Sequence, residues 1–104
     1  MKPVRFAPEF PDELAEAAAW YASQGPGLPQ QFLEEVEHTL QTVQMRPASF
    51  PCLRDLLPDL QIHRALLSRF PYAVLFLVLD EEVRVLAIAH LKRESGYWLD
   101  RLQA

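Results

Sequence analysis

The sequence predicts a single α+β domain in which a helical hairpin packs on one face of a small, mainly antiparallel sheet. Hydrophobic residues recur at helical spacing in the first half of the chain and alternate as in strands in the second half. The chain has 104 residues, of which 50% are hydrophobic, so it matches the usual size of one domain and can form a core. The predicted order is strand, helix, helix and three strands, and the domain spans residues 1–104.

The first half of the chain contains the predicted helical hairpin. Residues 4–6 form a short predicted strand, and residues 12–23 are rich in Ala, Leu and Glu, which favour helices. Two glycines and a proline at 25–27 end this helix, and Pro29 suits the first turn of a second helix over residues 29–45. An apolar stripe at helical spacing follows that second helix: Phe32, Leu33, Val36, Leu40 and Val43. The short turn predicts that the two helices are antiparallel.

The second half of the chain contains three predicted strands. Residues 60–63 alternate between apolar and polar side chains, and Leu66 keeps the apolar parity of Leu60 and Ile62, which predicts a strand over residues 60–67. Residues 72–79 are apolar on both faces, which is typical of a central strand covered on both sides. An acidic loop at 80–82 leads into a last strand at 83–90. For residues 91–104 the periodicity fits a short strand and a helical turn equally well.

Charge is distributed unevenly along the chain. The 14 acidic and 10 basic residues give a net charge of −4. Residues 1–45 carry two basic and seven acidic side chains, a net charge of −5, whereas residues 46–104 carry eight basic and seven acidic ones, a net charge of +1. An acidic chain lacks the long-range attraction that basic proteins exert on nucleic acids. The two halves are therefore expected to present different surfaces to partners.

Metal and cofactor chemistry are not expected from this sequence. Cys52, His38, His63 and His90 do not stand at metal-ligand spacings, and the three glycines form no phosphate-binding loop. A lone cysteine is typical of a reducing compartment, and the longest apolar run, eight residues, is far below the about 20 that cross a bilayer. We therefore expect a cytoplasmic protein with no cofactor and no membrane association.

A set of basic and aromatic side chains in the second half could carry chemistry. Its members are Arg64, Arg69, Arg84, His90, Lys92, Arg93, Tyr97, Trp98 and Arg101. Guanidinium groups bind phosphate, histidine exchanges protons near neutral pH, and aromatic rings stack on bases. A metal-independent ribonuclease needs these groups, since the 2′-OH of the RNA is itself the nucleophile. The same side chains also fit a structural interpretation, as edge charges and as part of the core.

Several stretches resemble the RelE/ParE family of toxins from type II toxin–antitoxin modules. They are Glu16-Ala17-x-x-Trp20-Tyr21, Pro26-Gly27-Leu28-x-x-x-Phe32-Leu33-x-Glu35-Val36, Pro47-x-x-Phe50-Pro51, Arg69-Phe70-Pro71-Tyr72-Ala73-Val74, Ala87-Ile88-Ala89-His90-Leu91-Lys92-Arg93 and Tyr97-Trp98-x-x-Arg101. They cover nearly the whole chain in the family's order. The resemblance implies the family fold, a helical hairpin on a small antiparallel sheet, and a cognate antitoxin as partner.

Two branches of this family differ in target. The RelE-like branch cleaves messenger RNA at the ribosome, and the ParE-like branch binds DNA gyrase. Ser68 stands where the RelE-type nuclease has an arginine, and the net charge of −4 is unlike that of a protein that docks on ribosomal RNA. The ParE-like branch is therefore preferred, with gyrase or another protein as target. An mRNA endoribonuclease is one alternative, and a non-toxic relative that only binds an antitoxin is another.

Each interpretation has its own candidate residues. The candidates for nuclease catalysis are Arg64, His90, Arg93 and Tyr97. The candidates for binding a protein target are Arg69, Lys92, Arg93, Trp98 and Arg101. Because residues 7–45 contain no lysine or arginine, a basic antitoxin segment is expected to meet acidic side chains on the helical hairpin. The candidates for that contact are Glu13, Glu16, Trp20, Glu34 and Glu37.

Overall fold

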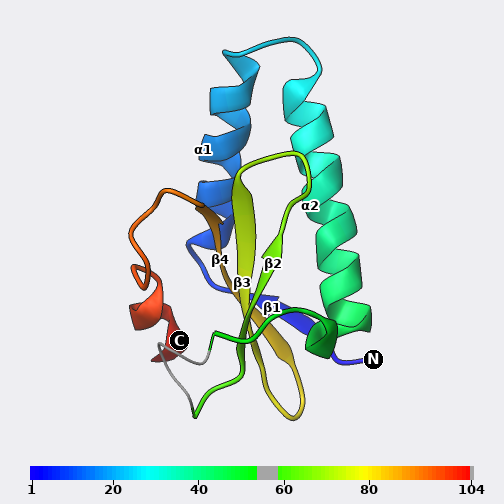
Figure 1. The fold of residues 1–104 in the computed structure, drawn as a ribbon, viewed down its shortest axis with the longest axis vertical. Helices are drawn as coiled ribbons and strands as arrows, with labels where there is room; N and C mark the ends of the chain where they lie inside the picture. Colours follow the sequence, from blue (N-terminus) through cyan, green and yellow to red (C-terminus); the bar gives the residue numbers. More distant parts are fainter. Residues whose placement is uncertain (54–58, 104) are drawn as a thin grey trace.

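A computed structural model describes residues 1–53 and 59–103, and its order of elements is the predicted one (Figure 1). The elements are β1 (Val4–Phe6), α1 (Phe10–Ala22), α2 (Leu28–Met45), β2 (Ile62–Leu66), β3 (Tyr72–Val78) and β4 (Val83–His90). Two short 3-10 helices, Pro47–Ser49 and Leu99–Gln103, follow α2 and end the described chain. The predicted α+β class with a helical hairpin and a mainly antiparallel sheet is confirmed.

The four strands form one mixed sheet in the order β1-β4-β3-β2. The pairs β2–β3 and β3–β4 are antiparallel, whereas β1 runs parallel to β4, with Val4 opposite Val83. The N-terminal strand thus extends the sheet beside the last strand. Because β1 has only three residues, its sequence pattern is too short to predict which strand it pairs with.

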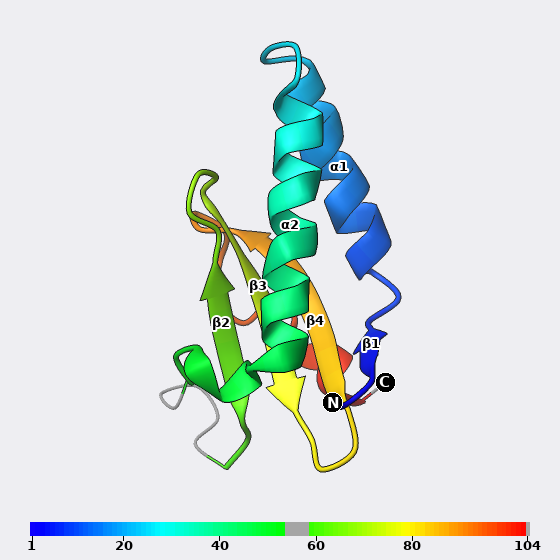
Figure 2. The same cartoon turned by 90° about the vertical axis from the view of Figure 1, so that its right-hand side faces the viewer.

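The helical hairpin covers one face of the sheet (Figure 2). Phe32 of α2 is fully buried, and its ring centroid lies 5.2–5.3 Å from those of Tyr21, Phe70 and Tyr72. These aromatic rings from α1, α2 and the β2–β3 region form the centre of the main core. The predicted α2 stripe is confirmed except at Leu33, whose side chain is exposed.

Several element boundaries differ from the predicted ones by one or two residues. Helix α1 begins at Phe10, two residues early, because Pro11 lies in the first turn, where a missing N–H breaks no helical hydrogen bond. Strand β2 spans only Ile62–Leu66. Its outer edge pairs locally with the segment before it: Arg64 N donates to Pro51 O at 2.9 Å. This pairing protects part of an otherwise open sheet edge.

The second face of the sheet is covered by the C-terminal segment. Opposite Leu75 and Phe76, β4 has one extra residue, Leu86, and this β-bulge turns both Leu86 and Ala87 away from the helices. Trp98 is only 3% exposed and packs against this face. The prediction that residues 72–79 are covered on both sides is confirmed, by the helices and by Trp98.

The turn between β2 and β3 is fastened to α2 by Glu35. Its carboxylate accepts hydrogen bonds from the backbone N–H and the hydroxyl of Ser68 and from the backbone N–H of Arg69. Burial alone would raise the pKa of the Glu35 carboxyl, but these hydrogen bonds and the nearby Arg69 guanidinium hold it below the ordinary value. Ser68 therefore has a structural task, because it fastens the β2–β3 turn to α2.

Candidate functional site

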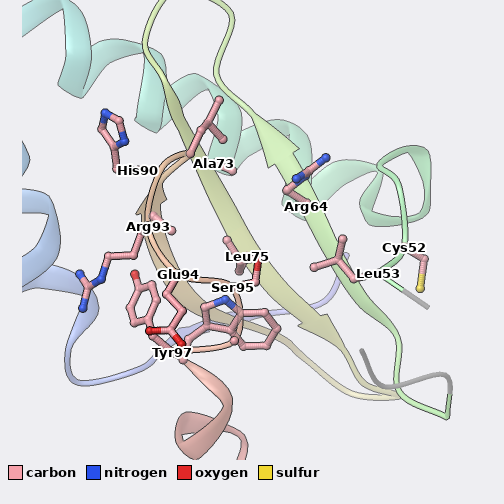
Figure 3. A pocket seen from close by; sticks show the side chains of 14 residues that line it. Cys52, Leu53, Arg64, Ala73, Leu75, His90, Arg93, Glu94, Ser95 and Tyr97 are labelled. Atoms are coloured by element: carbon pink, nitrogen blue, oxygen red, sulfur yellow. The ribbon is translucent and has the colours of Figure 1, made fainter. Parts of the chain in front are cut away.

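An open pocket of about 370 Å³ lies on the face of the sheet opposite the helices (Figure 3). Ala73, Leu75 and Ala89 of β3 and β4 line its apolar part, together with Leu53 and Trp98. The small alanines leave room that larger side chains would fill. Its volume is near the lower end of the about 300–1,000 Å³ that is typical of ligand pockets.

Basic side chains stand on two sides of this pocket. Arg64 projects from β2 on one side, and His90 and Arg93 lie at the end of β4 on the other (Figure 3). Cys52, Glu94, Ser95 and Tyr97 complete the polar lining. The structure thus brings all four nuclease candidates to one pocket.

Tyr97 lines the pocket, but its hydroxyl belongs to a hydrogen-bond network centred on Glu13 of α1. The Tyr97 hydroxyl donates to Glu13 Oε2 at 2.6 Å, and Arg101 Nη1 donates to Glu13 Oε1 at 2.9 Å. Arg101 Nη1 also donates to Leu86 O at 3.0 Å, and Ile88 N donates to Glu13 Oε1 at 3.3 Å. One carboxylate therefore links α1, β4 and the C-terminal segment.

This network gives three sequence candidates structural roles. Burial raises the pKa of the Tyr97 phenol, and the hydrogen bond to Glu13 raises it further, so the hydroxyl stays protonated at neutral pH. Arg101 is paired, with its side chain only 10% exposed, and Trp98 is part of the core. Among the target-binding candidates, Arg69, Lys92 and Arg93 are the exposed ones.

The surroundings of His90 and Arg93 limit what these two residues can do. His90 Nδ1 accepts the backbone N–H of Lys92 at 3.1 Å, so only Nε2 is left for a ligand. The imidazole packs edge-to-face on Tyr72, with a centroid distance of 5.1 Å. The Arg93 guanidinium carbon lies 3.8 Å from the centroid of the Tyr97 ring, a cation–π contact that holds it beside the pocket.

A second, smaller groove of about 240 Å³ lies between α1 and the end of β4. It is lined by Glu13, Glu16, Ala17, Trp20, Tyr72, Ile88, His90 and Arg93. The Trp20 side chain is 55% exposed, which is unusual for so large an apolar group. Of the antitoxin candidates, Glu13, Glu16 and Trp20 line this groove, and Glu34 and Glu37 are exposed on α2. The Glu13 carboxylate is engaged within the protein.

The central role of Glu13 was missed by sequence reasoning. In the first turn of a predicted helix it looked like an acid that the helix dipole favours on the surface. Its partners lie 75–88 positions away, and no local pattern signals a contact at that separation. The sequence carried one indication of this contact: Glu9 and Glu13 stand four residues apart, a spacing that lets both carboxylates reach one arginine, here Arg101.

Metal ligation and membrane insertion find no support in the part of the chain that the structure describes. Within residues 1–53 and 59–103, no three His, Cys, Asp or Glu side chains converge as metal ligands would. No helix in the same ranges combines the length and hydropathy needed to cross a bilayer.

Comparisons with known proteins agree with this architecture. The family model described as the ParE toxin of the type II toxin–antitoxin system parDE matches residues 4–94. A solved structure described as the chromosomal ParDE TA system from P. aeruginosa superimposes with a TM-score of 0.68 at 16% sequence identity. That match covers 86% of this chain and 96% of the other. A comparison with curated proteins found no match.

Proposed function

The chain belongs to the ParE family of toxins of type II toxin–antitoxin systems, and we propose that it stops growth by binding a protein target such as DNA gyrase. In this proposal a cognate antitoxin neutralises the toxin by binding to it. The toxin acts by occupying a surface of its target, so no chemical step and no cofactor are required of it.

The observation that carries this proposal is the engagement of Tyr97 and Arg101 by Glu13. A phenol with a raised pKa whose hydroxyl already donates a hydrogen bond to a carboxylate inside the protein is a poor general acid or base. The exposed cations that remain, Arg69, Lys92 and Arg93, suit recognition of an acidic protein surface. The net charge of −4 also provides no long-range attraction to RNA.

A supercoiling assay with purified gyrase tests the proposed target. We expect the full chain to inhibit supercoiling of a relaxed plasmid while messenger RNA in cells that express it stays intact. Arg93→Gln is expected to weaken inhibition about tenfold, because a charge-assisted contact at an interface is lost. Arg46→Gln, which removes an exposed arginine outside both cavities, serves as the matched control and should leave inhibition unchanged.

The second candidate function is an mRNA endoribonuclease, favoured by the meeting of Arg64, His90 and Arg93 around one pocket. In that case mapped messages would be cut on induction, and His90→Ala would abolish the cuts, while supercoiling would continue. Normal growth, intact messages and unimpaired supercoiling together would leave the third interpretation, a relative that only binds its antitoxin.

For the antitoxin we propose the groove between α1 and β4 as the docking site. The exposed Trp20 indole offers an apolar anchor, and Glu16 on the same helix offers a negative charge to a basic segment. An amphipathic helix with one apolar and one basic stripe could pack on the Trp20 indole and pair with the Glu16 carboxylate at the same time.

Replacing Trp20 with alanine is expected to weaken binding of the cognate antitoxin at least tenfold, because exposed aromatic anchors dominate such interfaces. The affinity of the wild-type pair should also fall as salt rises from about 0.05 to 0.5 M, since the contact is partly electrostatic. Isothermal titration calorimetry measures both effects, with Arg46→Gln as control. A salt-independent affinity would rule out the electrostatic part, and full affinity in Trp20→Ala would rule out the groove.

A further inference from the structure

We propose that the pocket on the sheet face opposite the helices binds an acidic peptide segment, with one large apolar side chain in the pocket and its neighbouring carboxylates on Arg64 and Arg93. The proposal rests on the proposed function, since it specifies how the toxin recognises a protein. It shares His90 and Arg93 with the antitoxin groove, which lies between α1 and the end of β4. Arg64 and the apolar face formed by Ala73, Leu75 and Trp98 line the pocket alone, whereas Glu13 and Glu16 line the groove, which we expect to take a basic segment.

The first step concerns the apolar part of the pocket. Ala73, Leu75 and Ala89 of the sheet line it together with Leu53 and Trp98, and all five belong to one apolar cluster. These side chains provide no hydrogen-bonding group of their own except the Trp98 indole N–H, so an apolar or aromatic group is the ligand they favour. The pocket is large enough for one such side chain but not for a folded element.

The second step concerns the charges at its rim. In the described part of the chain, Arg64 and Arg93 form no ion pair with a carboxylate. Among the other described arginines, Arg5, Arg69, Arg84 and Arg101 form such pairs, whereas the exposed Arg46, which lies outside both cavities, forms none. In a chain of net charge −4, two arginines without such pairs beside one apolar pocket indicate an anionic ligand.

The third step distinguishes a peptide from RNA. Arg64 lies on one side of the pocket, whereas Arg93 and His90 lie on the other, so two anionic groups separated by an apolar group match the site (Figure 3). An RNA strand would bring a phosphate at every nucleotide towards Glu94, which lines the same rim, and towards a chain of net negative charge. A short acidic peptide brings fewer charges and an apolar side chain, which the pocket can bury.

The test uses the full chain with Trp20→Phe, which leaves Trp98 as its only tryptophan. Because Trp98 lines the pocket, its fluorescence reports on occupancy. The probe is the synthetic peptide acetyl-Glu-Asp-Phe-Asp-Glu-amide, compared with the same peptide carrying Lys for each acid and with an oligouridylate of similar length. We expect the acidic peptide to change the emission in a saturable way, and the other two probes to bind at least tenfold more weakly.

Three variants in the same background test the site. Arg64→Gln and Arg93→Gln should each weaken the acidic peptide about tenfold, because each removes a charge-assisted contact. Ala89→Leu should weaken it by a similar factor with both charges kept, since the added methyl groups fill the pocket. Arg46→Gln is the matched control and should bind as the parent does. Circular dichroism confirms that each variant is folded.

Equal binding of the acidic and basic peptides, no binding of the acidic one, or affinities unchanged by all three variants would each overturn the proposal. Tighter binding of oligouridylate with the same dependence on Arg64 and Arg93 would also overturn it, in favour of RNA. The supercoiling assay gives an independent result. Inhibition of gyrase without peptide binding would overturn the role proposed for this pocket and keep the proposed function. Peptide binding without inhibition would keep the role of the pocket and overturn gyrase as the target.

Discussion

Replacing Trp98 with alanine is expected to lower the free energy of unfolding by about 3–5 kcal/mol, the usual cost of truncating a large buried aromatic side chain. The indole is 3% exposed and packs against Leu75 and Ala87 on the face of the sheet that the helices leave open. Without it, that face loses its main cover and the C-terminal segment loses its apolar anchor.

Urea-induced unfolding followed by circular dichroism measures this loss. The matched control is Trp20→Ala, the same chemical change at a side chain that is 55% exposed, for which we expect a loss of about 1 kcal/mol or less. Similar losses in the two variants would mean that Trp98 does not anchor the segment. The comparison therefore separates the burial of this indole from the general effect of removing a tryptophan.

Replacing Glu13 with alanine is expected to cost about 3 kcal/mol of unfolding free energy, because the charge of Arg101 then stays largely buried without its main partner. The Tyr97 hydroxyl and the Ile88 N–H lose their acceptor as well. The remaining contact of Arg101 with Glu9, at 3.7 Å, is too long and too exposed to replace it.

The control for this variant is Glu16→Ala, which removes an exposed acid from the same helix and should change the unfolding free energy by less than about 0.5 kcal/mol. Glu13→Gln keeps an acceptor oxygen without the charge, and its loss should lie between those of the alanine variants. In a double-mutant cycle, Glu13→Ala and Arg101→Met should show a coupling of about 1–3 kcal/mol. Strictly additive losses would show that the two side chains act independently.

The fold could be predicted largely because local patterns agree with the tertiary structure. The stripe on α2 and the two apolar faces of β3 each require burial, and the structure provides it on the sides that the patterns indicate. The parallel pairing of β1 could not be predicted, because three residues specify neither partner nor direction. The β-bulge at Leu86 could not be predicted either, because the surrounding residues are all apolar and an extra residue does not change their pattern.

The candidate site was predicted in part. Arg64 shares strand parity with Ile62, so it faces the side of the sheet that the helices leave open. There it meets His90, the last residue of β4, and Arg93, three residues beyond it, at one pocket. The same reasoning failed to foresee the engagement of Tyr97, because an acid on a helix and a phenol near the C-terminus gave no sign of contact across 84 positions. Long-range pairing of this kind depends on the assembled fold.

The network around Glu13 also governs when the domain can mature during synthesis. The Glu13 acceptor is translated 84 residues before Tyr97 and 88 residues before Arg101, which supply two of its donors. A nascent chain that ends before residue 97 lacks both donors as well as Trp98, and it exposes an apolar sheet face to solvent and to chaperones. The domain can therefore cover this face and complete this network only after residues 97–101 have been made.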